Sequence, residues 1–369
     1  MARHLQETLG EFTFVGPLQI ISQPFRQKHL LYSKAFNENY LCEFEPLLNR
    51  CLSLDVERRL RDLGRVDAII APGCFPCPIA LLNTDIPIIF WADATFAGLL
   101  KISPHHQNIC SENVWCGEEL QSQMLNRASL AVYASQWSAD SACHDYGIDR
   151  DKVGVLPYGA NLHFTIESED VLEQILIKRN TESCRLLFVA RSWHQRSGNF
   201  TLQVLRALKN SGLKATLVIA GCERTPELNQ IEASEEFEIE IYPTIDKDAA
   251  AKEQAYVELL STSHFMLHPS RTTCFGIGIC EASAWGLPVL AHNSGGVSSV
   301  LTDGINGALF SCDGDPELEA AEYASTIISL YKNPQRYRQL CRTAWKEYKS
   351  RLNWRSSVTS LVKLIEKRV

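Results

Sequence analysis

Residues 270–290 read SRTTCFGIGICEASAWGLPVL, and this stretch is built almost entirely from small and apolar side chains. Its pattern predicts a loop, then a short Ala/Ser/Gly-rich helix, then a buried strand that begins after Gly286. One acidic residue, Glu281, lies inside the predicted helix, and Thr273 lies eight positions before it. A carboxylate in so apolar a segment needs a partner, so the stretch directs attention to a binding site.

The same strand–helix alternation continues along most of the chain. Apolar runs over 66–73, 86–93, 129–135 and 152–161 predict buried strands separated by helices, and 13–21 is predicted as a further strand. The pattern restarts later, with strands predicted over 184–191, 214–222, 237–245, 263–270, 288–296 and 305–310. Continuous apolar strands between helices are typical of parallel sheets that are covered on both faces. The predicted fold class is therefore α/β, with two Rossmann-like, doubly wound domains that face a cleft.

The chain length also favours two domains, because 369 residues exceed one ordinary core. The polar segment 165–183 is interpreted as the linker. We expect an N-terminal domain over 1–165, a C-terminal domain over 166–345 and a final helical segment over 346–369.

The composition narrows the class of protein. The net charge of −7 argues against a nucleic-acid partner. The 13 cysteines show no framework spacing and no secretory signal precedes them, which indicates reduced thiols and a cytoplasmic protein. Cys74-Phe-Pro-Cys77 is interpreted as loop thiols, and no metal site is predicted. The sequence has no apolar stretch long enough to span a membrane, while peripheral membrane or complex association stays open.

Two arginines mark the first loop of the second domain, ARSWHQRSGN over 190–199. Arg191 and Arg196 precede Ser197-Gly198, where a helix is predicted to begin. Helix N-termini offer free N–H groups and a positive dipole end, so the loop suits an anionic diphosphate. The alternative is a Ser197 N-cap beside two solvated arginines.

Three further places at predicted strand ends attract attention. Phe275-Gly276 begins the helix that carries Glu281, whose carboxylate can accept two hydrogen bonds from a vicinal diol such as a ribose. The alternative is a buried Glu281 paired with an arginine. Gly295-Gly296 suits close backbone approach to a ligand, and Asp93 ends the predicted strand 86–93 as a cleft candidate.

Taken in order, these segments resemble the retaining glycosyltransferases of the GT-B fold, family 4 type. The strings that carry the resemblance are ASQWSADSACHDYGIDRDKVGVLPYGANLHF, LLFVARSWHQRSGNFTLQVL and HPSRTTCFGIGICEASAWGLPVLAHNSGGVSSVLTDGINGALF. The third string is the most specific, and the set spans most of residues 66–312.

The resemblance implies a role for each matching residue. Glu281 would hold the ribose hydroxyls, while Phe275 and Gly276 would line the phosphate and sugar pocket. Gly295 and Gly296 would lie near the diphosphate, and Arg191 falls on the family's diphosphate arginine. The N-terminal domain, 1–165, would hold a glycan or small-molecule acceptor, with Asp93 on that side. The C-terminal domain, 166–345, would bind the nucleotide-sugar, and the helix over 346–369 would return to the N-terminal domain. Such enzymes use a nucleotide-sugar donor and typically need neither a metal nor another cofactor.

Three features depart from the family pattern. Thr273 stands where the family has a second glutamate that contacts the donor sugar, and a neutral hydroxyl makes weaker hydrogen bonds than a carboxylate. Ser197 stands at the loop lysine, which leaves Arg196 as the nearby cation. The start of the chain reads as the family's first helix, so we expect the first strand of the N-terminal domain to be missing.

The sequence therefore predicts a hexosyltransferase of the polysaccharide-biosynthesis type that acts with retention. The main alternative is a catalytically impaired GT-B protein that binds sugar nucleotides as a scaffold subunit of a glycan-assembly complex. A sugar-nucleotide epimerase on the same fold is a third reading, but it would need acid/base carboxylates that the predicted cleft lacks.

Overall fold

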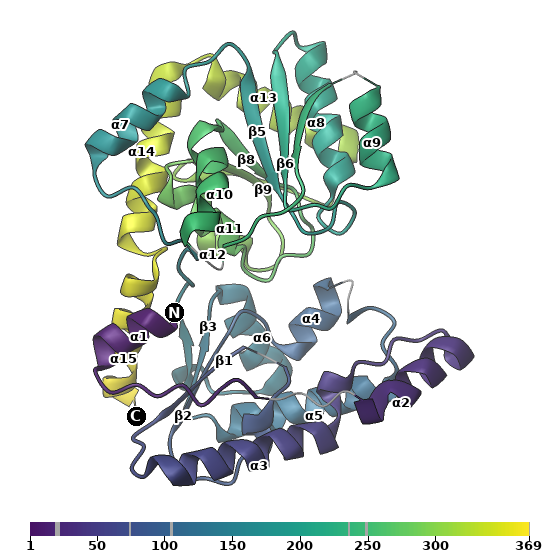
Figure 1. The fold of residues 1–369 in the computed structure, drawn as a ribbon, viewed down its shortest axis with the longest axis vertical. Helices are drawn as coiled ribbons and strands as arrows, with labels where there is room; N and C mark the ends of the chain where they lie inside the picture. The colour runs from purple at the N-terminus through teal and green to yellow at the C-terminus, as the bar shows by residue number, and fades with distance from the viewer. Residues whose placement is uncertain (19–22, 74, 104–105, 235–236, 248–249, 369) are drawn as a thin grey trace. The chain divides into compact units, whose positions relative to one another are not determined.

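The computed structural model describes residues 1–18, 23–73, 75–103, 106–234, 237–247 and 250–368 of the chain (Figure 1). The chain divides into two compact units. Unit 1 comprises Met1–Pro157 together with Val358–Val369, and unit 2 comprises Tyr158–Ser357.

Unit 1 contains a parallel sheet whose strands follow the order β1-β2-β3-β4. All five residues of β2 are buried, because this strand lies in the middle of the sheet between two layers of helices (Figure 1). The strands of the sheet are β1 (Ile69–Pro72), β2 (Ile88–Ala92), β3 (Leu130–Tyr133) and β4 (Val153–Val155).

The helices of unit 1 begin and end where the sequence supplies capping residues. In α6, the Ser135 hydroxyl accepts a hydrogen bond from the N–H of Ser138, and Gly147 ends the helix with a left-handed φ of 66°. The core beneath these helices includes Phe90, Leu120 and Met124. The helices are α1 (Ala2–Leu9), α2 (Arg26–Leu31), α3 (Pro46–Leu63), α4 (Phe96–Ile102), α5 (Ser111–Arg127) and α6 (Gln136–Tyr146), with short turns η1 (Gln23–Phe25), η2 (Tyr32–Phe36), η3 (Cys42–Phe44), η4 (Pro78–Leu81) and η6 (Arg150–Lys152).

The strand predicted over 13–21 is wrong in its described part. Residues 13–18 form no strand, and 19–21 lie outside the described residues. Gly16-Pro17 interrupts the apolar run, and proline has no N–H with which to join a strand ladder. The apolar content of the segment alone therefore did not predict its backbone conformation.

Unit 2 contains a six-stranded parallel sheet with the order β10-β9-β8-β5-β6-β7. The chain builds outward from β5 to β7, then returns to the other side of β5 and builds outward again through β8, β9 and β10. This is the strand order of a doubly wound Rossmann sheet. The strands are β5 (Cys184–Val189), β6 (Ala215–Ala220), β7 (Glu238–Tyr242), β8 (Phe265–His268), β9 (Val289–His292) and β10 (Gly307–Phe310).

Helices cover this second sheet, and α8 packs against α13 while α11 packs against α14. Phe188, Leu217 and Phe265 contribute to the core from the strands, and Val204 and Ile327 contribute to it from helices. The helices are α7 (Glu169–Lys178), α8 (Gly198–Asn210), α9 (Pro226–Ala233), α10 (Ala250–Thr262), α11 (Ile277–Ala284), α12 (Val297–Val300), α13 (Pro316–Tyr331) and α14 (Pro334–Ser350), and the last helix, α15 (Trp354–Arg368), belongs to unit 1 from Val358 onward. α14 begins at Pro334, directly after Asn333, and α15 begins at Trp354, directly after Asn353.

Unit 2 begins at Tyr158, ahead of the polar segment that was expected to open the second domain. The reason is a buried carboxylate on α10. Glu253 accepts hydrogen bonds from the backbone N–H groups of His163 and Phe164 at 2.8–3.0 Å, and its Oε2 lies 2.9 Å from His163 Nδ1. The segment that follows Tyr158 is thereby fastened to unit 2.

A buried arginine ties the ends of two helices together. Arg179, at the C-terminus of α7, is only 2% exposed. Its guanidinium donates to four main-chain carbonyls at 2.9–3.0 Å. Two of these belong to Leu260 and Ser261 at the end of α10, and two belong to Trp285 and Gly286 at the end of α11. The positive charge therefore lies at the negative dipole ends of two helices, where it is stabilised without a carboxylate partner.

Replacing Arg179 with Met should destabilise unit 2 strongly, because the apolar stem is kept while buried carbonyls lose their donors. We expect a loss of about 3–5 kcal/mol in the free energy of unfolding, the range for breaking a buried charged network. Urea denaturation measures the loss. Lys178→Met is the matched control, since Lys178 is the exposed neighbour and should change stability by less than about 0.5 kcal/mol. Equal effects of the two variants would contradict the assigned role.

Candidate functional site

The reversal of strand order in unit 2 lies between β5 and its neighbour β8. In open α/β sheets, ligands bind outside the carboxyl ends of the strands at such a switch point. The loops that leave these two strands are 190–197 and 269–276. They contain most of the residues that the sequence predicted for donor binding, so the topology places a candidate nucleotide site here.

Arg196 joins the two loops. Its Nη1 donates to Ser270 Oγ and to the carbonyl of Thr272, both at 3.2 Å. Arg191, in the same loop, is exposed at the end of β5. The structure thus brings Arg196 to the β8 loop and leaves the charge of Arg191 accessible to an anion.

The start of α8 differs from a simple helix N-cap. Ser197 occupies the N-cap position with a left-handed φ of 61°, and its hydroxyl makes no capping bond. The N–H of Gly198 donates to the carbonyl of Trp193 at 2.8 Å, so this donor is already used. A Cβ at Gly198 would lie 2.2 Å from the Trp193 ring, so packing alone requires glycine here. The alternative of a capping Ser197 is not found.

Thr273 is buried and is contacted by a histidine that sequence reasoning missed. Its Oγ1 lies 3.1 Å from His268 Nε2, at the carboxyl end of β8. Burial, followed by the nearby charge of Arg196, lowers the pKa of His268 to about 4, so the imidazole is neutral at pH 7. The carbonyl of Thr273 accepts the N–H of Gly296 at 3.2 Å, which connects this loop to the Gly295-Gly296 turn. The position of His268 at the end of a central strand was the signal that could have identified it.

Phe275 and Gly276 form the entry to α11. Gly276 has a φ of 95°, and a Cβ there would lie 2.9 Å from Ile279 Cδ1, so only glycine fits without strain. The ring of Phe275 is 2% exposed and packs edge-on against Tyr158, with ring centroids 5.4 Å apart. Phe275 therefore packs into the protein interior and holds the loop in place.

Glu281 is 2% exposed and already has partners on both oxygens. Lys247 Nζ lies 2.7 Å from Oε1, and the Tyr256 hydroxyl donates to Oε2 at 2.9 Å. Burial raises the pKa of Glu281, while the charge of Lys247 and the hydrogen bonds from Lys247, Tyr256 and the Asn161 N–H oppose that rise. The cation beside the carboxylate is a lysine from the loop before α10, not the arginine that the alternative interpretation supposed. Lys247 and Tyr256 are distant in sequence, so periodicity gave no signal for either.

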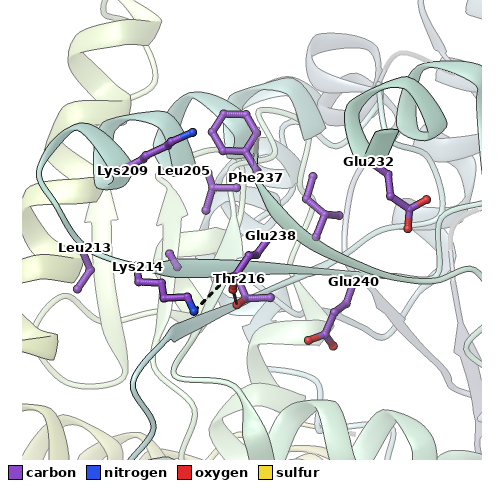
Figure 2. A pocket seen from close by; sticks show the side chains of 11 residues that line it. Leu205, Lys209, Leu213, Lys214, Thr216, Glu232, Phe237, Glu238 and Glu240 are labelled. Atoms are coloured by element: carbon purple, nitrogen blue, oxygen red, sulfur yellow. Dashed lines mark hydrogen bonds and ion pairs between the residues drawn. The ribbon is translucent and has the colours of Figure 1, made fainter. Parts of the chain in front are cut away.

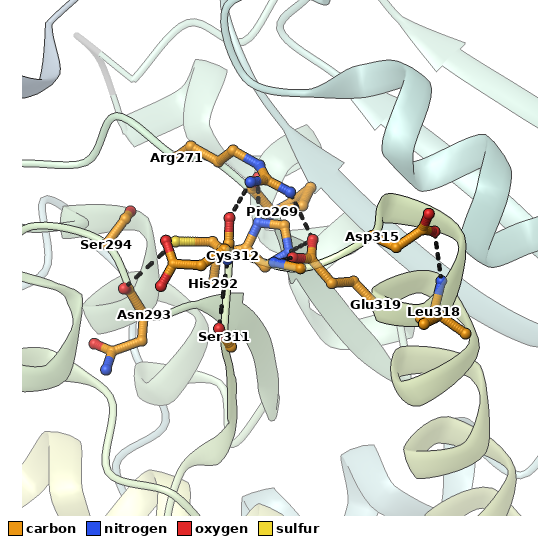
Figure 3. Close-up of polar contacts among 12 residues, drawn as sticks. Pro269, Arg271, His292, Asn293, Ser294, Ser311, Cys312, Asp315, Leu318 and Glu319 are labelled. Carbon is orange, nitrogen blue, oxygen red and sulfur yellow. Dashed lines mark hydrogen bonds and ion pairs between the residues drawn. The ribbon is translucent and has the colours of Figure 1, made fainter.

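A second polar cluster, formed by Arg271, His292 and Glu319, holds the loop 269–276 that follows β8 (Figure 3). Arg271 Nη2 lies 2.6 Å from Glu319 Oε2, and His292 Nε2 lies 3.3 Å from the same oxygen. The other ring nitrogen of His292 donates to the carbonyl of Pro269 at 2.9 Å, because a carbonyl can only accept. Burial lowers the pKa of His292. The cluster links the loop to the start of α13 and positions the segment that carries Thr273.

In unit 1, Asp93 follows β2 directly. Burial raises the pKa of its carboxyl, and a hydrogen bond from its own backbone N–H opposes that rise. Its carbonyl oxygen accepts a hydrogen bond from the Ser138 hydroxyl at 2.5 Å. A desolvated carboxyl at a strand's carboxyl end is a functional candidate on physical grounds.

One cavity of unit 2 lies elsewhere (Figure 2). It has a volume of about 620 Å³ and is lined by residues at the amino ends of β6 and β7, including Lys214, Thr216 and Glu238. Glu238 pairs there with Lys214 at 3.2 Å and with Thr216 at 2.9 Å. This cavity is at the opposite end of the strands from the candidate site, so we assign it no part in nucleotide binding.

Within the described residues, no group of three or more His, Cys, Asp or Glu side chains could hold a metal ion. Within the same residues, no helix is long and apolar enough to cross a membrane.

The candidate site lies in a segment that is similar to a known protein family. Residues 183–333, which include both loops of the switch point, match the family model described as "Glycosyl transferases group 1". Curated relatives include the D-inositol 3-phosphate glycosyltransferases of Paenarthrobacter aurescens, 24% identical over 62% of this chain and 55% of that protein, and of Nocardiopsis dassonvillei, 25% identical over 66% and 56%. The chain spans about half the length of the curated relatives it matches.

Solved structures confirm the fold. Sucrose-phosphate synthase from Thermosynechococcus elongatus superimposes with a TM-score of 0.63 at 15% identity, covering 89% of this chain and 80% of that one. Anabaena HepE in complex with UDP gives a TM-score of 0.61 at 16% identity, covering 86% and 82%. HepE in complex with UDP-glucose gives 0.53 at 18%, covering 76% and 72%. The predicted two-domain α/β architecture of the GT-B type is therefore confirmed.

Replacing Asp93 with Asn should stabilise unit 1 at alkaline pH. Because the folded-state pKa is raised, the stability that Asp93 contributes is present at low pH and is lost as pH rises through that pKa. We expect Asp93→Asn to exceed wild type by about 1 kcal/mol at pH 8, with a smaller difference at pH 4. Urea denaturation at both pH values measures this. The exposed Asp62→Asn is the control, and a difference that does not change with pH would refute the prediction.

Proposed function

We propose that this protein is a family 4 type glycosyltransferase that moves a hexose-type sugar from a nucleotide-diphosphate sugar to a glycan or small-molecule acceptor, with retained configuration. The main support for the proposal is that the segment matched by the family model contains the switch point of the unit 2 sheet. The segment 183–333 contains both loops, and Arg196 bridges them. The printed names of the curated relatives and the UDP complexes of HepE support the same class of donor.

In this proposal, the bond between the sugar C1 and the diphosphate oxygen breaks, and the electron pair leaves with the diphosphate. The acceptor hydroxyl forms the new bond to C1 and gives its proton to the departing diphosphate. Arg191 and Arg196 stabilise the charge that develops on the leaving group, which is the main catalytic need of such a reaction. Glu281 binds the ribose, Thr273 faces the sugar, and Asp93 contributes on the acceptor side. The reaction needs no resident metal or cofactor.

The scaffold alternative is not favoured by the comparisons, because several of the named relatives are glycosyltransferases. One experiment separates the two functions. Purified protein is incubated with UDP-, GDP-, ADP- and CDP-linked hexoses, and release of the nucleoside diphosphate is measured. We expect release from at least one donor, and Arg196→Met should lower it by about 100-fold through lost stabilisation of the leaving group.

Arg206→Met on the exposed face of α8 is the matched control and should retain full activity. Absence of release from every donor, combined with measurable nucleoside diphosphate binding by calorimetry, would replace the transferase with the scaffold function.

Replacing Thr273 with Glu tests how the donor motif works. The new carboxylate would lie beside neutral His268 and close to Arg196, where a charge-assisted hydrogen bond to the sugar is stronger than one from a hydroxyl. We expect turnover to rise by about tenfold and the pKa of His268 to rise as well, because a carboxylate stabilises the imidazolium. Steady-state kinetics and NMR titration measure the two effects.

The matched control is Thr273→Val, which removes the hydroxyl at nearly constant volume and should lower turnover. A fall in turnover for Thr273→Glu would show that the site is tuned to a different donor from that of the two-glutamate enzymes.

A further inference from the structure

The hydrogen bonds at Glu281 leave too little room for a ribose. An ionised carboxylate has about four lone-pair positions for hydrogen bonds. Lys247 Nζ and the Tyr256 hydroxyl occupy one each. Because Glu281 is only 2% exposed, one of these two donors has to move before a ribose diol can reach the remaining positions.

Tyr256 is held in place, because its side chain is fixed in α10 and is 1% exposed. Lys247 differs, because its side chain is 31% exposed and extends from a loop on a flexible four-carbon stem. Lys247 is therefore the donor that can be exchanged.

The positive charge of Lys247 also has an electrostatic effect on Glu281. The groups that face Glu281 are Tyr256 from α10, Cys280 from its own helix, Lys247 from the loop and the Asn161 N–H. Tyr256 is neutral, because burial raises its pKa well above the ordinary value. Lys247 supplies the positive charge that favours the ionised form of Glu281 against burial.

We infer that Lys247 is a positioning residue of the donor site: it holds Glu281 as a carboxylate while the site is empty and gives up its place to the ribose diol when nucleotide binds. The inference rests on the proposed function in assigning the ribose to Glu281. It adds a residue that neither the sequence motif nor the family match identifies, and it predicts a pH dependence that a purely structural ion pair would not produce.

The test compares affinities for UDP and 2′-deoxy-UDP, and for GDP and 2′-deoxy-GDP, by calorimetry between pH 6.5 and 9. The ratio within each pair reports on the 2′-hydroxyl alone, because titration of the phosphates cancels. Wild type should keep a constant preference for ribose across this range. In Lys247→Met, the ribose preference should fall by about tenfold at pH 6.5 and should increase as pH rises, because burial without the lysine charge favours the protonated form of Glu281.

Lys252→Met is the matched control, since Lys252 pairs with Asp246 at 2.6 Å on the same segment and its side chain is 62% exposed. It should behave as wild type. Glu281→Gln should lower the ribose preference at every pH, and adding Lys247→Met to it should change nothing further. Lys247→Gln repeats the test with a neutral polar side chain if the Met variant folds poorly.

A ribose preference in Lys247→Met that stays constant with pH would overturn the inference, and so would an effect of Lys247→Met that persists in the Glu281→Gln background. If Glu281→Gln leaves the ribose preference intact while sugar transfer continues, the inference fails and the proposed function stands. If neither UDP nor GDP binds and no donor is turned over, the proposed function fails as well.

Discussion

The geometry of unit 2 depends most on the hydrogen bonds that the guanidinium of Arg179 donates. It is buried, and it donates hydrogen bonds to carbonyls at the ends of α10 and α11 and to the sulfur of Cys341. A buried charge that loses such partners is costly, so both helix ends are constrained at once. These helices carry Tyr256 and Glu281, and the 2.9 Å bond between the two side chains follows from that constraint.

The candidate site is assembled by loops that the strand order brings together. The reversal between β5 and β8 places two strand-end loops at one edge of the sheet, and Arg196 joins them. Arg271 and Glu319 then anchor the β8 loop to the start of α13 (Figure 3). The loops are thus fixed by charge-assisted hydrogen bonds before any ligand arrives, which reduces the ordering cost of binding.

The charges at this edge of the sheet suit an anionic ligand. Thr273 and neutral His268 contribute none, while Lys247 offsets Glu281. The arginines of the β5 loop remain as excess positive charge, which favours a diphosphate over a neutral sugar. Thr273 brings no charge to this position, but it provides a hydroxyl that can form hydrogen bonds.

The sequence by itself determined the parallel sheets, because continuous apolar strands alternating with helices leave few other arrangements. It also located the two strand-end loops and Glu281, since polar residues in those contexts are conspicuous. It misjudged residues 13–18, where apolar content concealed the effect of Gly16-Pro17. Only the tertiary structure decided which side chains meet: Lys247 with Glu281, and Thr273 with His268. Those pairs come from burial and loop closure, which no local pattern encodes, and they set the charge of the site.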